Sequence, residues 1–279
     1  MSDRIFVLGA GRAGRGLARA LRASGVEVVG VHGRHEPGGE DGVTVGAIPP
    51  ALARASVALV TVRDAQIDGA LDELLAAGLA PGTVVLHASG SAEPAALARV
   101  RAAGHPSGTF HPLVPIADPA RAPEMLRGAW IGIDGDAAAR DAAIRLAERL
   151  GAHPLDIPPG EKARYHAAAV MVSNFPVVLL YLGERLLVEA GLDPRVAHRA
   201  LHPLFSAMAD NLRVHRGPRA LTGPLVRGDA DTVRRHLVAL ASDPEALAAY
   251  RALSRAALPL AVEAGAEGEK VEEIREVLG

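Results

Sequence analysis

The chain has 279 residues, a formal net charge of −2 and no cysteine, and 49% of its residues are hydrophobic. Without cysteine it can form neither disulfide bonds nor thiolate metal sites. Its nearly balanced charge provides no basic footprint for nucleic acid or for an anionic membrane. At this length we expect one large or two moderate domains, with a small molecule as the binding partner.

The N-terminus and the apolar runs bear on where the protein resides. The first segment, MSDRIFVLGAGRAG, lacks the charged, apolar and cleavage regions of a secretory signal. The longest apolar run, residues 167–183, is interrupted by Ser173, Asn174 and Pro176, so we interpret it as a buried helix and not as a membrane span. We therefore expect a cytoplasmic, globular protein.

The first half of the sequence alternates short apolar runs with helical patterns, which predicts an α/β fold. We expect helices at residues 13–23 and from residues 64, 93 and 136, and strands at residues 4–8, 26–31, 57–62, 83–87, 108–110, 129–133 and 153–157. Such alternation is typical of a doubly wound, Rossmann-like parallel sheet, here over residues 1–157. These sheets bind ligands outside the carboxyl ends of their strands.

The glycine-rich turn after the first strand carries the most specific motif. Gly9 permits a tight turn, Gly11 lets the backbone approach a pyrophosphate, and Gly14 allows close packing of the helix on the strand. The N-terminus of that helix offers free N–H groups and a partial positive charge to phosphates. The alternative is a glycine-rich turn without a ligand. We predict a dinucleotide site formed by Gly9, Ala10, Gly11, Arg12, Ala13 and Gly14.

The end of the second strand predicts which dinucleotide binds. NAD sites usually place a carboxylate there for the ribose hydroxyls, but this chain has His32, Gly33 and Arg34. Arg34 would attract the 2′-phosphate of NADP(H), which a carboxylate would repel. We therefore predict NADP(H) as the cofactor, with Arg12 as a second phosphate contact, while Glu36 leaves NAD(H) open.

Polar residues at further strand ends are candidates for contacts with the cofactor or the substrate. Ser89 and His111 both follow buried strands, so their side chains should reach the nicotinamide side of the sheet. We assign Ser89 to cofactor binding and His111 to substrate binding; the alternative for each is a turn residue bonded to local backbone. Asp64 is expected to cap the helix that follows it. The histidines show no H-x-H or H-E-x-x-H spacing, so we expect no metal site.

The second half, residues 158–279, is helical throughout and is predicted to form a substrate and dimerisation domain. Asp193, Asp229 and Asp243 have the sequence context of N-caps. The apolar helices in this half, including VVLLYLGERLLVEAGL, carry more hydrophobic face than a small helical domain needs. A homodimer formed through these C-terminal helices would bury the surplus.

The helix that opens this domain carries the candidate catalytic residues. At about 100° per residue, Lys162, His166 and Ser173 fall in one polar stripe of an otherwise apolar helix. Lys162 and Lys270 are the only lysines among 30 lysines and arginines, and a lysine kept where arginine is the rule suggests that its proton is used. The alternative is a solvated surface charge, as we expect for Lys270.

The order of these features resembles a known superfamily. A Rossmann domain with Gly9, Gly11 and Gly14, followed by a helical domain that opens with Lys162, is similar to 6-phosphogluconate dehydrogenase, ketopantoate reductase and pyrroline-5-carboxylate reductase. The segments HASG, HPL, KARYHAAAVMVSNF and LTGPLVRGD further resemble a subgroup of bacterial NADP-dependent oxidoreductases with a characteristic C-terminal helical domain. The resemblance covers nearly the whole chain, and ketopantoate reductase is the functional relative it favours.

The resemblance implies an NADPH-dependent reductase of a small 2-oxo acid or related carbonyl, such as ketopantoate. It implies that Lys162 is the general acid that protonates the carbonyl oxygen as hydride arrives. The relatives usually carry Asn one helical turn later, where this chain has His166, whereas Asn174 lies roughly 18 Å from Lys162 along a straight helix. We therefore predict Lys162 and His166 as the catalytic pair, Asn174 as a further catalytic candidate and Ser173 as a substrate contact.

Other functions remain compatible with the sequence. An imine reductase, or an enzyme that exchanges hydride between NADP and a deazaflavin, would share the predicted fold, and the deazaflavin enzyme would need no lysine acid. A non-catalytic sensor would bind NADP without turnover.

Overall fold

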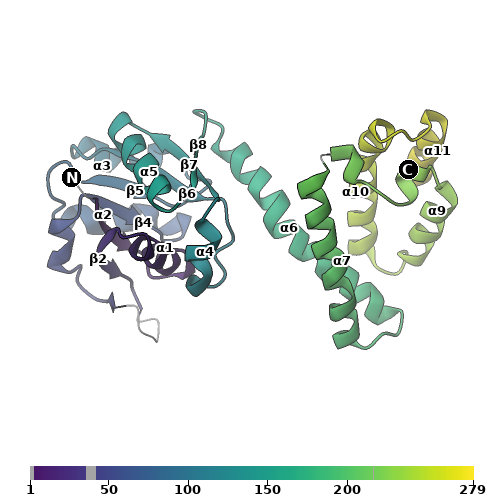
Figure 1. The fold of residues 1–279 in the computed structure, drawn as a ribbon, viewed down its shortest axis with the longest axis horizontal. Coiled ribbons are helices and arrows are strands. Elements are labelled where there is room, and N and C mark those ends of the chain that lie inside the picture. Colours follow the sequence, from purple (N-terminus) through teal and green to yellow (C-terminus); the bar gives the residue numbers. More distant parts are fainter. Residues whose placement is uncertain (1–2, 36–41, 216) are drawn as a thin grey trace. The chain divides into compact units, whose positions relative to one another are not determined.

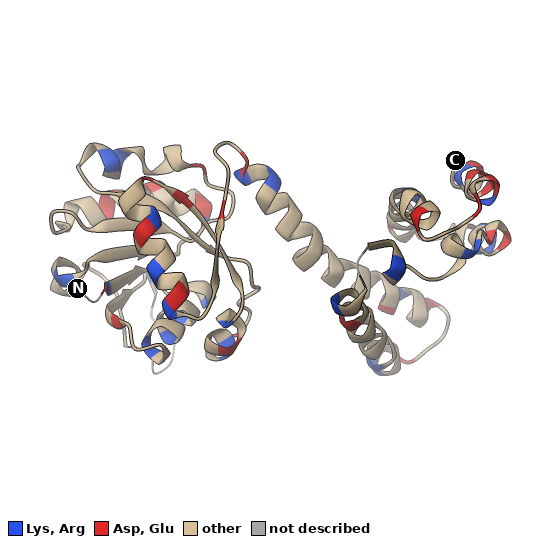
Figure 2. Cartoon of the chain, turned by 45° about the horizontal axis from the view of Figure 1, so that its top comes forward, with Lys and Arg blue, Asp and Glu red and all other residues tan. Residues whose placement is uncertain are grey.

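The computed structural model describes residues 3–35, 42–215 and 217–279 of the chain. The chain divides into two compact units of different architecture, Met1–Asn174 and Phe175–Gly279 (Figure 1). Acidic and basic residues are interspersed in both units (Figure 2). The division falls later than the predicted boundary after Ile157, because the first turns of the next helix pack on the sheet.

The first unit is built on an eight-stranded sheet in the order β3-β2-β1-β4-β5-β6-β7-β8. The strands are β1 (Arg4–Leu8), β2 (Glu27–His32), β3 (Val43–Thr44), β4 (Val57–Val60), β5 (Val84–His87), β6 (Ser107–Pro112), β7 (Trp130–Gly135) and β8 (His153–Asp156). The helices are α1 (Arg12–Ala23), α2 (Ile67–Ala76), α3 (Ala98–Ala102), α4 (Ala122–Leu126) and α5 (Ala137–Arg149). Short 3-10 segments are η1 (Pro50–Arg54), η2 (Asp64–Gln66), η3 (Pro94–Leu97) and η4 (Pro119–Arg121). The predicted doubly wound, Rossmann-like sheet is therefore confirmed.

Two strands depart from the parallel direction that the sequence predicts. Neighbouring strands from β1 to β6 pair in parallel, whereas β7 pairs antiparallel with β6, and β8 runs parallel to β7. A parallel neighbour needs a crossover connection, usually a helix. The β6–β7 connection holds only η4 and α4, and both pack on α1. The chain therefore returns beside β6 in the opposite direction.

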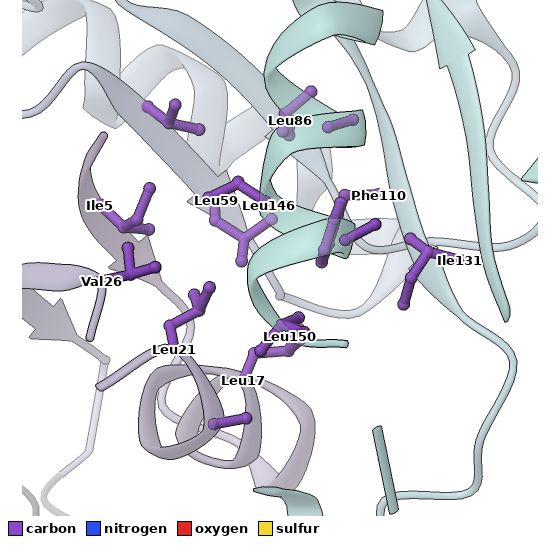
Figure 3. Packing of buried hydrophobic residues seen from close by; sticks show 14 of the residues in the cluster. Ile5, Leu17, Leu21, Val26, Leu59, Leu86, Phe110, Ile131, Leu146 and Leu150 are labelled. Carbon is purple, nitrogen blue, oxygen red and sulfur yellow. The ribbon is translucent and has the colours of Figure 1, made fainter. Parts of the chain in front are cut away.

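The apolar side chains of the strands are divided between two faces of the sheet, because successive residues of a strand point to opposite sides. On one face, Phe110, Ile131 and Leu86 belong to a core that includes residues of α1 and α5 (Figure 3). On the other face, Phe6 and Val85 belong to a second core with residues of α2 and α3. Both cores are buried, so the carboxyl ends of the strands are held on a rigid base.

Helix α6 (Lys162–Glu189) follows β8 and continues unbroken past Pro176. In the structure the Glu161 N–H donates to the Pro158 carbonyl at 3.1 Å, in a turn that precedes the helix. The N-terminal turns of α6 belong to the first unit, and the residues from Phe175 onward belong to the second.

The second unit is helical throughout, as predicted. Besides the C-terminal half of α6 it contains α7 (Pro194–Val214), η5 (Gly217–Ala220), α8 (Pro224–Arg227), α9 (Ala230–Ala239), α10 (Pro244–Glu263) and α11 (Gly268–Leu278). The carboxylates of Asp193, Asp229 and Asp243 cap α7, α9 and α10, which confirms the predicted N-caps. The apolar residues of α11 recur every three or four positions among many charges.

The apolar residues of α6 and α7 are largely exposed, which contradicts the expectation of a buried helix. Val177 and Tyr181 on α6 are 68% and 61% exposed, and Leu204 on α7 is 67% exposed. No Asp, Glu, Lys or Arg occurs between Arg164 and Glu184, a gap that Figure 2 shows as the tan stretch of α6. Helix α6 is long and apolar enough to cross a membrane. Core helices of soluble proteins can meet the same criterion of length and composition.

Candidate functional site

The glycine-rich loop between β1 and α1 is shaped by close contacts. Gly9 has a φ of +122°, which favours glycine, and a Cβ atom at Gly14 would lie 1.9 Å from the Gly9 carbonyl oxygen. The hydroxyl of Thr61, after β4, donates to that same carbonyl at 2.8 Å. A Cβ atom at Gly11 would meet nothing within 4 Å. The fold therefore requires glycine at 9 and 14, whereas Gly11 leaves the backbone open to a ligand.

A cavity of about 410 Å³ lies beside this loop, between the ends of β2 and β4 and helix α2. Its lining residues are Leu8, Gly9, Ala10, Gly11, His32, Gly33, Arg34, His35, Thr61, Val62, Arg63, Gln66, Ala70 and Glu73. Arg12 and Ala13, in the first turn of α1, lie outside this lining. Among the described residues, no side chain caps α1 and its first turn holds no acidic residue. This helix terminus is therefore suited to an anion.

Among the described residues, Arg34, Arg63 and Glu73 bring charged side chains to the lining of the cavity. Arg34 is 57% exposed, and its guanidinium lies 3.5 Å from a carboxylate oxygen of Glu73 on α2. Gly33 allows the close approach of the loop, because a Cβ atom there would lie 2.5 Å from the Cβ of Ala10. Glu36, which leaves NAD(H) open in the sequence, lies outside the described residues. Arg34 is thus placed for a phosphate, but an anion would have to replace Glu73.

The loop after β5 is held by its own hydrogen bonds. The Ser89 hydroxyl accepts from the N–H groups of Ser91 and Ala92 at 3.2 and 3.0 Å, which is the turn role named above as its alternative. Asp64 accepts a short hydrogen bond from the Ser91 hydroxyl, while among the described residues no side chain caps η2 or α2. The expected cap is therefore wrong: Asp64 lies inside the first turn and reaches the neighbouring loop instead.

Lys162 is buried against the sheet. Its ammonium donates to the Thr109 hydroxyl at 2.6 Å and lies 3.3 Å from a carboxylate oxygen of Asp134. Thr109 and Asp134 face each other across the antiparallel β6–β7 pair. The Lys162 side chain is only 1% exposed, and it adjoins a small cavity of about 190 Å³. The ammonium thus lies beside Thr109, which pairs with His87 at the end of β5, and the general-acid role of Lys162 stays a prediction.

His87 extends this buried group. Its Nε2 lies 3.1 Å from the Thr109 hydroxyl, and its Nδ1 accepts from the Ser89 N–H at 3.2 Å. Burial, assisted by the charge of Lys162, lowers the pKa of His87 to about 4. Burial also lowers the pKa of Lys162, although Asp134 opposes this shift. Because Nδ1 accepts, the neutral ring carries its proton on Nε2, and the network joins α6 to β5, β6 and β7.

Tyr165 and His166 on α6 meet His111 near the carboxyl end of β6. The Tyr165 hydroxyl lies 2.8 Å from Nδ1 of His111, and the rings of His111 and His166 are 5.9 Å apart. A Cβ atom at Gly90 would lie 2.6 Å from Nδ1 of His166 and 2.7 Å from Cε1 of His111, so glycine makes room for both rings. Burial lowers the pKa of His111 to about 4 and raises that of the Tyr165 phenol. Both groups are therefore uncharged at neutral pH.

The remaining predicted residues of α6 lie away from this group. Ser173 is half-buried and Asn174 is exposed. Because α6 is continuous, its rise of about 1.5 Å per residue keeps Asn174 roughly 18 Å from Lys162. The structure thus brings His111 and His166 together and leaves Ser173 and Asn174 apart from them. The described residues contain no group of three or more histidine, aspartate or glutamate side chains placed to hold a metal ion.

Four side chains that hold this site together were not predicted from the sequence: His87, Thr109, Asp134 and Tyr165. A signal for Thr109 and Asp134 is present in the alternation of SGTFHP and WIGIDG. It puts Thr109 on the face opposite Phe110, and Asp134 on the face opposite Ile131 and Ile133. That signal is informative only once β6 and β7 are known to pair. Tyr165 had no such signal, because one tyrosine in an apolar helix is usually a packing residue.

The comparisons with protein families and curated proteins give limited information. Residues 129–257 match the family described as a domain of unknown function (DUF2520). This match covers less than half of the chain, from the start of β7 into α10. No curated protein matches the sequence.

Several solved structures share the fold over nearly the whole chain. A candidate NADP oxidoreductase from Bacteroides fragilis is 23% identical, with a TM-score of 0.75 over 92% of this chain and 98% of that chain. A reductive aminase from Aspergillus terreus, in complex with NADPH and ethyl levulinate, is 19% identical, with a TM-score of 0.63 over 99% of both chains. A pyrroline-5-carboxylate reductase from Coxiella burnetii is 13% identical, with a TM-score of 0.59 over 99% of both chains. At these identities the likeness establishes the fold.

Proposed function

We propose that the protein is an NADP(H)-dependent oxidoreductase that reduces a small carbonyl or imine. The observation that carries the proposal is the open glycine-rich loop beside a cavity of about 410 Å³, with the His111 group at the carboxyl ends of the same sheet. The proposal is supported by solved structures of similar fold, which include a candidate NADP oxidoreductase and a reductive aminase bound to NADPH.

The residues of the loop fit a dinucleotide. The backbone at Gly11 is free of neighbouring atoms, so the N–H groups at the start of α1 could approach a pyrophosphate. Arg34 would give up its contact with Glu73 and bind the 2′-phosphate of the cofactor instead. Because only NADP(H) has this phosphate, Arg34 favours NADP(H) over NAD(H). The bound cofactor would supply the hydride, and the protein would bind and orient it at the strand ends.

The substrate we propose is a small 2-oxo acid such as ketopantoate, or an imine formed from a carbonyl compound. The sequence resemblance favours the 2-oxo acid. The likeness to a pyrroline-5-carboxylate reductase and a reductive aminase favours the imine. Because His111 is uncharged at neutral pH, its ring N–H group can hydrogen-bond either a carbonyl oxygen or an imine nitrogen.

NADPH oxidation by the purified protein tests the proposal across small 2-oxo acids, cyclic imines and mixtures of a carbonyl compound with an amine. We expect turnover with at least one of these classes. Arg34→Ala should weaken NADPH binding roughly 10- to 100-fold and leave NADH binding almost unchanged, since it removes a charge-assisted contact to the phosphate. Arg12→Ala tests the second predicted phosphate contact in the same assay. Tight NADPH binding without turnover would favour the sensor, and tighter binding of NADH by the native protein would contradict the cofactor assignment.

We also propose a homodimer in which a second copy covers the exposed apolar surface of α6 and α7. Leu204, Met208 and Leu212 lie four residues apart on α7, and all are exposed. Apolar stripes of this kind usually mark an interface. Sedimentation velocity should give a dimer, and Leu204→Glu should release monomers, whereas Val238→Glu, at a 77% exposed position on α9, should not. A native monomer would contradict the homodimer, and a protein that needs detergent to stay in solution would favour a membrane role for α6.

A further inference from the structure

The antiparallel β6–β7 pair leaves space for the ring of Tyr165. His111 on β6 faces Gly132 on β7. A Cβ atom at Gly132 would lie 2.3 Å from the Tyr165 hydroxyl and 2.7 Å from the ring carbon that bears it, so the ring occupies the space a side chain would fill. The phenol then lies 2.8 Å from Nδ1 of His111, with the two ring planes 80° apart. The ladder register and one glycine therefore fix where the phenol meets the imidazole.

We propose that Tyr165 fixes His111 in the neutral tautomer that carries its proton on Nε2, and that this N–H binds the oxygen or nitrogen of the bond being reduced. His111 is then a catalytic residue, because it touches the reacting atoms, and Tyr165 is a positioning residue that acts through it. The inference rests on the proposed reductase function and deepens it.

In the hydrogen bond that we propose between Tyr165 and His111, the phenol is the donor and Nδ1 is the acceptor. Among the described residues, Nδ1 of His111 is the single partner of the Tyr165 hydroxyl. Tyr165 is half-buried, and burial keeps its phenol protonated by raising the pKa, so in the arrangement that we propose the phenol donates to Nδ1. A ring whose Nδ1 accepts carries its proton on Nε2. Tyr165 thereby does for His111 what the Ser89 N–H does for His87.

The Nε2 side of the His111 ring lies beside Gly90, where a Cβ atom would lie 2.8 Å from Nε2 and where glycine leaves the space open. Among the described residues, Nε2 has no hydrogen-bond partner, and unlike Nδ1 of His166 it is not a buried, unpartnered atom. His111 lies near the carboxyl end of β6, in the parallel series that includes β1, β4 and β5, and the glycine-rich loop follows β1. A substrate bound at this edge can therefore meet both Nε2–H and the cofactor.

A neutral imidazole is suited to this role because it can stabilise developing negative charge without first gaining a proton. In the proposed reduction the carbonyl carbon gains a hydride from NADPH, which becomes NADP⁺, and the electron pair of the C=O bond moves to oxygen. That oxygen is held by the Nε2–H of His111 and takes one proton from solvent water. An imine nitrogen would be held in the same way.

The tautomer can be measured without any substrate. Ring-nitrogen chemical shifts in NMR spectra distinguish protonated from unprotonated nitrogens, and the His111→Gln spectrum identifies the His111 signals by their loss. We expect a proton on Nε2 of His111 in the native protein and a shift of population toward the Nδ1–H tautomer in Tyr165→Phe. A proton on Nδ1 in the native protein, or unchanged ring shifts in the variant, would overturn the inference.

Kinetic measurements then distinguish a positioning role of Tyr165 from an effect of its substitution on folding. Glutamine at 111 places an amide N–H near the position of Nε2 and has no tautomer to fix. Tyr165→Phe should lower kcat roughly tenfold in the native background, with little change in the KM for NADPH, and should have no further effect in His111→Gln. An equal loss in both backgrounds would overturn the positioning role. If no carbonyl or imine is reduced by the native protein, the proposed function fails, and the NMR result alone decides the tautomer.

Discussion

The two units of the chain differ in how completely they bury their apolar residues. In the first unit, helices cover both faces of the sheet, and before α6 only Val45 and Trp130 are exposed large hydrophobic residues among those described. In the second unit, a small core joins α9, α10 and α11, and it includes no residue of α7, whose single buried residue is Ala197. The first unit can therefore hold side chains in fixed positions, while the second leaves apolar residues of α6 and α7 exposed.

The largest expected effect tests whether the first unit depends on its buried ion pair. Lys162→Met would leave Asp134 buried without its cation, which should cost about 3–5 kcal/mol of unfolding free energy. Trp130, the one tryptophan, lies on β7, so its fluorescence follows the first unit, while circular dichroism follows both. The double variant Lys162→Met, Asp134→Leu should recover most of the loss. An unchanged Trp130 transition in the single variant would show that the pair does not stabilise this unit.

A pair of glycine variants compares fold and binding within the first unit. Gly14→Ala should destabilise it by about 3 kcal/mol, because the added Cβ would lie 1.9 Å from the Gly9 carbonyl oxygen. Gly11→Ala should change stability by less than about 0.5 kcal/mol, since nothing lies within 4 Å of its Cβ position, but it should weaken NADPH binding. Fluorescence-detected unfolding and NADPH titration measure the two effects. Native NADPH affinity in Gly11→Ala would place the cofactor away from this loop.

The two units should also respond differently to acid. The folded pKa of His87 is about 4, below the ordinary value of 6.5, so the unfolded chain takes up a proton as the pH falls below 6.5 and the folded chain does not. Stability of the first unit should therefore fall between pH 6.5 and 4, by as much as about 1.4 kcal/mol per pH unit for this histidine. His87→Gln should reduce the dependence of the unfolding free energy on pH. Part of this dependence should remain, because burial shifts the pKa of His111 in the same direction.

The described histidines of the second unit are exposed, so the burial of a neutral ring does not act there. Unfolding at a series of pH values, followed by Trp130 fluorescence and by circular dichroism, would show the difference. Equal slopes for native protein and His87→Gln would contradict the burial of a neutral His87.

The smallest expected effect concerns the second unit alone. The Arg185 guanidinium on α6 donates to both carboxylate oxygens of Asp243 at 2.7 and 2.6 Å, and to Glu245 at 3.0 Å. Arg185→Met should destabilise this unit by about 1 kcal/mol, because Asp243 is buried and keeps only its capping role. Glu245→Gln, at a 77% exposed side chain, should cost less than about 0.5 kcal/mol. A matching shift of the Trp130 transition would show that the two units do not unfold independently.

Local sequence patterns predicted the parts of this protein that depend on local physics. The Rossmann order, the glycine roles at Gly9 and Gly14 and the N-caps at Asp193 and Asp229 follow from periodicity and from backbone requirements within a few residues. The reversed direction of β7 depends on how α4 packs on α1, which no local pattern encodes.

The candidate site was predicted less completely for the same reason. The sequence indicated Lys162 from its rarity, but its burial depends on Thr109 and Asp134, which lie far away in the chain. His111 and His166 were identified singly from a strand end and a helix stripe. Their meeting, and the phenol of Tyr165 between helix and sheet, emerge only when α6 packs on β6 and β7.

The antiparallel register of β6 and β7 determines both the geometry of the candidate site and the packing of the apolar core. The same ladder pairs Thr109 with Asp134, Phe110 with Ile133, and His111 with Gly132. A slip of one residue would turn every side chain of one strand to the other face and bring polar groups into the apolar core. A sheet with the wrong register would thus lose both its stability and the geometry of the site. Every molecule that reaches the stable fold therefore also has the site assembled.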